Sequence, residues 1–147
     1  MYARAPPGST TASFIFPKRG PMHESISRKS MMYDVSFELD AHLLAIRWHR
    51  IFTAAEAAAY TQDVMRRFLA ARFRPGYRLI IDMSACGPQP QDTLAALARH
   101  MAPFPKASRI AIVVVGAIAR AQVRRVMTQP YLRLFDDAAS ARAWLVD

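Results

Sequence analysis

The sequence predicts one α/β domain built on a mixed β-sheet, with the element order β-β-α-β-α-β-α-β-α. Three observations predict it. Residues 33–39 alternate strictly between apolar and polar side chains, and a second run, residues 42–49, follows after Asp40-Ala41, as in an antiparallel hairpin. Residues 77–83 and 109–115 are apolar without alternation, which is typical of strands covered on both faces. The segments between strands have helical spacing of apolar residues, so the later strands should run parallel, joined by right-handed crossovers.

The chain is 147 residues long and 52% hydrophobic, which is enough for one domain with a real core. Residues 1–30 are rich in proline, glycine and serine and show no sustained period. They hold five basic residues against one acidic residue, a net charge of +4. We therefore expect a flexible basic N-terminal extension over residues 1–30, not needed for folding, and a folded domain over residues 31–147. Met31 and Met32 leave open a translation start at that boundary.

The first helix is predicted by a capping box. Thr53 and Glu56 have the spacing at which each side chain accepts a hydrogen bond from the other residue's main-chain N–H. Apolar side chains then recur at helical spacing as far as Phe68, and the segment 74–76 contains proline and glycine. We expect a helix over about residues 54–72, with Phe68 in the core.

The remaining elements follow in order. Apolar residues at helical spacing predict a helix over residues 94–101, and a third helix begins after Gly116. Residues 131–135 form the last strand. Asp136-Asp137 then offers a side-chain cap for a closing helix, in which we expect Trp144 to be a core residue.

The ordered set of elements resembles the STAS fold, and most of all the small bacterial STAS-like proteins grouped with the anti-sigma-factor antagonists. The CRAL-TRIO lipid-transfer fold is a more distant comparison. The resemblance covers residues 32–147 and rests on four stretches: the Thr-x-x-Glu helix start, Ile81-Asp82-Met83-Ser84, Phe135-Asp136-Asp137 and Ala143-Trp144-Leu145. It implies a non-enzymatic regulatory domain that binds protein partners.

The resemblance also implies a phosphorylation switch, from which this chain departs. In the classical antagonists a serine or threonine at the start of the second helix is phosphorylated to break the complex. Asp82 and Ser84 match the beginning of that pattern, but the acceptor position then falls on Gln91, which cannot be phosphorylated. Thr93 lies two residues further on and would need an alignment shift. We expect a domain without the usual phospho-acceptor.

A ligand or partner surface is expected where the parallel strands end. In open α/β sheets, ligands gather at the carboxyl ends of the strands, beside the N-termini of the following helices. This surface would include Asp82, Ser84, Gly87, Gln91, Asp92, Thr93, Gly116, Arg120 and Arg124. The alternative is that Asp82 and Ser84 only cap a turn and that the arginines belong to an ordinary solvated helix face.

Enzymatic and metal chemistry find little support in the sequence. A hydrolase could be built from Ser84 or Cys86 as nucleophile and His100 as base, but His100 lies at the far end of its helix. His42 and His49 are seven residues apart and should face opposite sides of a strand. Phosphate-loop and dinucleotide-binding signatures do not occur. We expect no catalysis, no bound metal and no cofactor.

The composition limits which partners and which cellular compartment can be expected. The net charge of +9 comes without a nucleic-acid-binding motif, so we expect no specific nucleic acid. A protein partner is the first hypothesis, a lipid or small amphipathic ligand is the alternative, and a homodimer stays open. A single cysteine fits the reducing cytoplasm. The longest apolar run, residues 110–119, is about half the length of a membrane-spanning helix, so no transmembrane segment is expected.

Overall fold

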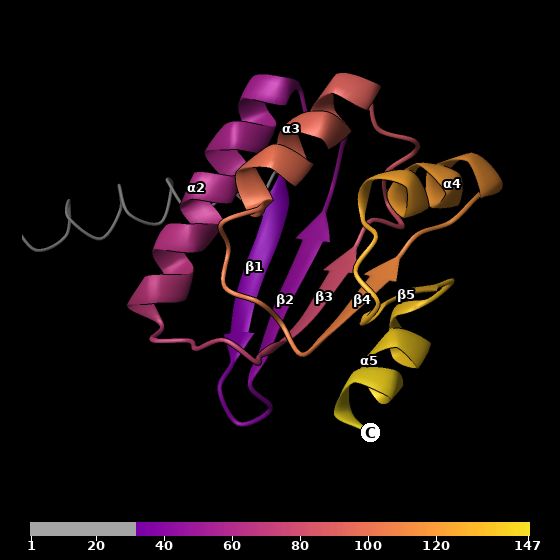
Figure 1. The fold of residues 1–147 in the computed structure, drawn as a ribbon. Helices are drawn as coiled ribbons and strands as arrows, with labels where there is room; N and C mark the ends of the chain where they lie inside the picture. The colour runs from indigo at the N-terminus through magenta and orange to yellow at the C-terminus, as the bar shows by residue number, and fades with distance from the viewer. Residues whose placement is uncertain (1–31) are drawn as a thin grey trace, which may run out of the picture. The chain divides into compact units, whose positions relative to one another are not determined.

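The computed structural model describes residues 32–147, and the expected extension, residues 1–30, lies outside them. The described residues form a five-stranded β-sheet with four helices (Figure 1). In chain order the elements are β1 (Tyr33–Glu38), β2 (Leu43–Trp48), α2 (Ala54–Ala70), β3 (Arg78–Asp82), α3 (Gln91–Met101), β4 (Arg109–Val113), α4 (Ala117–Val126), β5 (Leu132–Phe135) and α5 (Ala138–Val146). The predicted order is confirmed.

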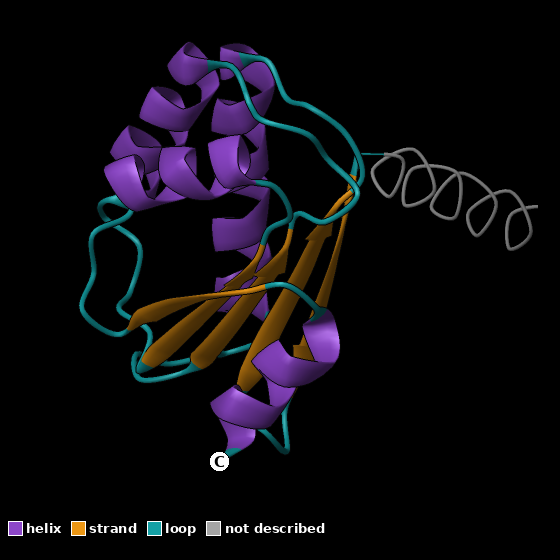
Figure 2. Ribbon diagram, turned by 90° about the vertical axis from the view of Figure 1, so that its right-hand side faces the viewer, coloured by secondary structure: helices purple, strands orange, loops and turns teal. Residues whose placement is uncertain are grey.

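The sheet is mixed, as predicted. Its strands lie in the order β1-β2-β3-β4-β5; β1 pairs with β2 antiparallel, and every later pair is parallel. Helices α2, α3 and α4 lie on one face of the sheet, as right-handed crossovers that each move to the next strand in the same direction require (Figure 2). The last helix, α5, is not a crossover and covers the opposite face (Figure 2).

The capping box predicted for the first helix forms at the start of α2. The Glu56 main-chain N–H donates to Thr53 Oγ1 at 3.1 Å, and the Thr53 N–H donates to Glu56 Oε1 at 2.9 Å. The helix ends at Ala70, two residues earlier than expected. Arg72 explains the difference, since its φ of +61° is left-handed and cannot continue a right-handed helix.

Two apolar layers hold the elements together. The larger layer lies between the sheet and α2 to α4, and Phe68 is buried there, as expected. In the smaller layer, Ala141 and Leu145 of α5 pack on the other face. Trp144 is only partly buried, so its assignment to the core was wrong. Consecutive helical residues point about 100° apart, and Leu145 takes the position that faces the sheet.

Trp144 instead packs at the margin of the smaller layer. The guanidinium carbons of Arg109 and Arg133 lie 5.0 and 5.3 Å from the centre of its ring, at cation–π distance. Phe135 contacts the same ring. None of the helices formed by residues 32–147 is long and apolar enough to cross a membrane.

Candidate functional site

The parallel strands β2 to β5 all end at one edge of the sheet, where the four helices begin (Figure 1). Four connections make up this carboxyl edge: residues 49–53, 83–90, 114–116 and 136–137. The sequence placed its candidate surface here.

Asp82 ends β3 and is 6% exposed. Its Oδ1 accepts hydrogen bonds from the Ser84 main-chain N–H at 2.9 Å and from the Ser84 hydroxyl at 2.6 Å, while Oδ2 accepts from Arg47 Nη2 at 3.2 Å. Burial by itself raises the pKa of Asp82, but the bonds from Ser84 and Arg47 outweigh it, and the pKa lies below its ordinary value. The carboxylate therefore stays ionised and holds the turn that follows β3.

The first residues of α3 differ sharply in exposure. Gln91, at the position where the resemblance places a phospho-acceptor, is exposed, and so is Asp92, whose Oδ1 accepts from the Thr93 main-chain N–H at 2.9 Å. Thr93 is 0% exposed, and its hydroxyl donates to the Phe52 carbonyl at 2.6 Å. A kinase could reach Thr93 only if the loop before α2 and the start of α3 separated.

Gln89 joins three elements of this edge, and sequence reasoning missed it. Its side chain is 2% exposed and its Oε1 accepts from the Phe52 N–H at 3.1 Å. Its main-chain N–H donates to Gln122 Oε1 at 3.1 Å, and its carbonyl accepts from Gln122 Nε2 at 2.9 Å. No sequence signal links two glutamines 33 residues apart. Together these bonds fix the 83–90 connection to α4 and to the start of α2.

The arginines of α4 do not act as a pair. Arg120 donates to Asp136 Oδ1 at 2.7 Å and to the Val114 carbonyl at 3.4 Å, so it connects α4 to the loop after β5. Arg124 is exposed one turn further along the helix. Gly116 precedes α4 with a φ of +98°, which places the first turn of that helix. Arg125 is exposed as well, and both arginines lie in the last turn of α4, so the structure does not place Arg124 at the carboxyl edge.

The nucleophiles of this edge are not activated. The Ser84 hydroxyl donates a hydrogen bond to Asp82, and the lowered pKa of this carboxyl makes it a weak base. Burial, and then the nearby Asp82 charge, raise the pKa of the Cys86 thiol, so it stays protonated. His100 lies away from both, in a shallow groove between α2 and α3 that Met65 also lines.

The other histidines lie apart from one another. His49 contacts Asp34 at 2.9 Å, and the His42 ring lies against Phe73, 5.1 Å between centres. Among residues 32–147 no three histidine, cysteine or acidic side chains come together as metal ligands would.

Exposed apolar side chains gather at the carboxyl edge. Residues 32–147 contain six exposed large apolar side chains, and three of them, Ile51, Val115 and Ile118, belong to this edge or to the first turn of α4. Their exposed fractions are 47%, 55% and 68%. Ion pairs flank them, Arg50 with Glu56 at 3.0 Å and Arg120 with Asp136 at 2.7 Å. We call Ile51, Val115 and Ile118 the edge triad.

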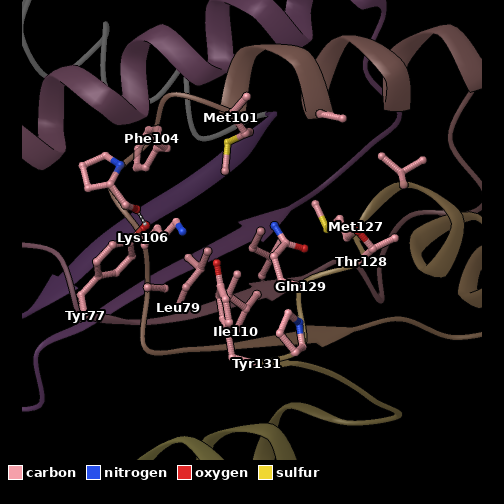
Figure 3. Close-up of a pocket in the computed structure, with 17 residues that line it drawn as sticks. Tyr77, Leu79, Met101, Phe104, Lys106, Ile110, Met127, Thr128, Gln129 and Tyr131 are labelled. Atoms are coloured by element: carbon pink, nitrogen blue, oxygen red, sulfur yellow. Dashed lines mark hydrogen bonds between the residues drawn. The ribbon is translucent and has the colours of Figure 1, made fainter.

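A separate cavity lies where the parallel strands begin. It has a volume of about 470 Å³ and is bounded by the residues just before β3, β4 and β5 and by the C-terminal ends of α3 and α4 (Figure 3). We call it the amino-edge cavity. None of the residues that the sequence proposed for a site lines it.

Comparison with known proteins supports the fold. No protein-family model matches the chain, and neither does any curated protein. A solved structure described as an uncharacterised protein of the DUF3478 family with a SpoIIAA-like fold, from Shewanella loihica PV-4, matches with a TM-score of 0.56 and 17% sequence identity. The match covers 78% of this chain and 94% of the other. The chain has a SpoIIAA-like fold, which is the STAS-like fold that the sequence predicted.

Proposed function

We propose that this chain is a non-enzymatic interaction domain that binds a protein partner through its carboxyl edge. One observation carries the proposal: half of the exposed large apolar side chains in residues 32–147 belong to the edge triad. Apolar side chains at the centre of a patch, with polar groups around them, are typical of protein interfaces. The ion pairs of Arg50 and Arg120 would form such a rim.

The hydrogen bonds beneath the surface support the same proposal. Asp82 holds the turn after β3, Thr93 is bonded to the loop before α2, and Gln89 is bonded to α4. A surface whose loops are already ordered loses less conformational entropy when it binds. The carboxyl edge would therefore bind as a preformed surface, with Gly87, Gln91 and Asp92 contributing polar contacts.

In this proposal the complex is not controlled by phosphorylation of α3. The exposed position carries Gln91, and Thr93 donates its hydroxyl to a buried carbonyl. Hydrolysis is the least supported function, because the carboxylate bonded to Ser84 has a lowered pKa and is a weak base, and His100 lies away from both Ser84 and Cys86. A cytoplasmic location completes the proposal, since a lone cysteine such as Cys86 stays reduced there.

The experiment compares two substitutions by aspartate, one inside the edge triad and one outside it. Ile118→Asp places a charge in the edge triad. Leu69→Asp places the same charge near the C-terminal end of α2, beside the groove between α2 and α3 and away from the carboxyl edge, where Leu69 is 64% exposed. Tagged full-length chains would be expressed in the organism of origin and their captured proteins quantified by mass spectrometry. We expect a specific partner to be retained by the unchanged chain and by Leu69→Asp, and to be lost with Ile118→Asp.

Two results would contradict the proposal. One is a partner that both aspartate variants retain equally, and the other is a partner lost only with Leu69→Asp. If the captured protein is a second copy of this chain, sedimentation analysis should show a dimer that Ile118→Asp dissociates, and the interface is then a homodimer.

A second candidate function is the binding of a small amphipathic molecule. It is favoured by the amino-edge cavity, which lies apart from the carboxyl edge and has the volume of a small-molecule site. The two functions are compatible, because they use opposite edges of the sheet.

A further inference from the structure

The amino-edge cavity has an apolar floor and apolar walls. Leu79, Ile81 and Ile110 of the central strands form the floor. Met101 from the end of α3 and Met127 from the end of α4 stand on either side (Figure 3). Methionine side chains adapt to ligands of irregular shape. A volume of about 470 Å³ lies within the usual range for small-molecule sites, about 300–1,000 Å³.

The cavity exists because α4 is short. This helix has ten residues and ends at Val126, and Met127 is already extended, with φ −111° and ψ 105°. The chain then continues as a loop to Tyr131 before β5 begins. Helix α4 therefore does not cover the amino ends of β4 and β5. On the side of α3, the cavity is lined by the small side chain of Ala98, which leaves the space open.

The only charge that the described residues bring to the lining of the cavity is positive. Lys106 is the single charged residue among those that line it, and no carboxylate lines it. In Figure 3 the side chains of Lys106, Gln129 and Tyr131 point toward the middle of the space. The Tyr77 hydroxyl, by contrast, donates to the Pro105 carbonyl at 3.0 Å and is engaged by the protein. The cavity thus offers a cation and further donors beside an apolar volume.

We infer that the amino-edge cavity binds a small amphipathic carboxylic acid. The apolar part of the acid packs on the strand floor between Met101 and Met127, and its carboxylate accepts hydrogen bonds from Lys106, with Gln129 and Tyr131 as further donors. Lys106 is exposed, so a neutral ligand would gain no ion pair with its ammonium, and a cationic ligand would be repelled by it. The inference rests on the second candidate function and names its ligand class.

The test uses decanoate, with 1-decanol and decylamine as neutral and cationic probes of the same chain length. Full-length protein labelled with ¹⁵N would be titrated with each probe, and binding followed by the amide shifts of Ile110, Met127 and Tyr131. We expect decanoate to bind at least several-fold more tightly than decanol, because a charge-assisted bond adds to the same apolar burial. Decylamine should bind most weakly.

Three variants assign the effect to the cavity. Lys106→Gln should weaken decanoate binding by about twofold to fivefold, as expected for an ion pair with an exposed lysine, and leave decanol binding unchanged. Arg74→Gln removes an exposed cation outside the cavity and should change neither. Ala98→Phe fills the space from α3 and should abolish binding of both, while the rest of the amide spectrum shows a folded protein.

The experiment distinguishes failure of the carboxylic-acid assignment from failure of the small-ligand function. Equal binding of decanol and decanoate, or a Lys106→Gln variant that binds decanoate normally, would overturn the acid assignment and leave the small-ligand function standing. If no probe shifts the amides around the cavity, or if Ala98→Phe binds decanoate as before, the ligand function itself is overturned. Shifts centred on Met65 and Leu69 would place the binding in the groove between α2 and α3 and would also contradict the inference.

Discussion

The buried Thr93 hydroxyl donates a hydrogen bond of 2.6 Å to the main-chain carbonyl of Phe52, 41 residues earlier in the chain. The bond joins the start of α3 to the loop before α2. It gives the one hydroxyl near the expected switch position a structural role, and it leaves the exposed position to Gln91.

We expect no phosphate on this part of the chain. Thr93 has no exposed surface, and the Ser84 hydroxyl is bonded to Asp82. The intact mass of the protein from its native host, with sites mapped by fragmentation, should show neither residue modified. Appreciable phosphate on Thr93 or Ser84 would contradict this prediction and restore an antagonist-type switch.

Replacing Thr93 by valine should destabilise the domain. The change keeps the shape of the side chain but leaves the Phe52 carbonyl unpaired in the interior, at a cost of about 1–3 kcal/mol in the free energy of unfolding. Urea denaturation measures it. Gln91→Ala, on the exposed face of the same turn, is the control and should stay within about 0.5 kcal/mol of the unchanged protein. Equal effects at the two positions would contradict the assigned role of Thr93.

Asp82→Asn should lower stability in a pH-dependent way. The amide loses the charged interactions with Arg47 and Ser84, which we expect to cost about 1–3 kcal/mol at neutral pH. Because the folded pKa of Asp82 lies below its unfolded value, the contribution is present above the unfolded pKa and is lost as the pH falls through the folded one. The difference between the two proteins should therefore shrink below about pH 4.

The control for this change is Asp40→Asn, in the exposed turn between β1 and β2. It should leave the free energy of unfolding within about 0.5 kcal/mol at neutral pH. If Asp82→Asn differs from the unchanged protein by the same amount at pH 3 and pH 7, the Asp82 carboxylate is not the source of the stabilisation.

Phe68→Ala should be far more damaging than Trp144→Ala. Phe68 is 1% exposed and contacts Phe73, Tyr77 and Phe104, so its truncation should cost about 3–5 kcal/mol. Trp144 is partly exposed and would lose mainly the two arginine contacts and the contact with Phe135, a cost of about 1–2 kcal/mol. Thermal and urea unfolding would compare them, and the reverse ranking would show that α5 contributes more than its burial indicates.

Two glycines of the carboxyl edge make a matched pair. Gly116 has a φ of +98°, where an L-residue is strained even though a Cβ would meet open space, so Gly116→Ala should cost about 1–2 kcal/mol. Gly87 has equal space without a positive φ, and Gly87→Ala should be neutral or stabilise by about 0.4–1 kcal/mol. Denaturation curves that rank the two the other way would show that the conformation before α4 is not required.

Much of the fold could be predicted because its signals are local. Alternation in β1 follows from the two-residue period of a strand, and the capping box of α2 needs only residues 53 and 56. The right-handedness of crossovers then decides on which face α2, α3 and α4 lie. None of these inferences requires knowledge of a distant contact, and the structure confirms the element order and the mixed sheet.

The sites depend on contacts that only the tertiary structure decides. The resemblance placed Gln91 at the expected phospho-acceptor position, but only packing shows that Thr93 is bonded to Phe52 and that Arg120 is paired with Asp136. Trp144 was misjudged because residue type predicts burial less well than helix phase against a particular sheet. The amino-edge cavity depends on where α4 stops relative to α3. Such a space belongs to the packing of whole elements, and no local pattern of residues encodes it.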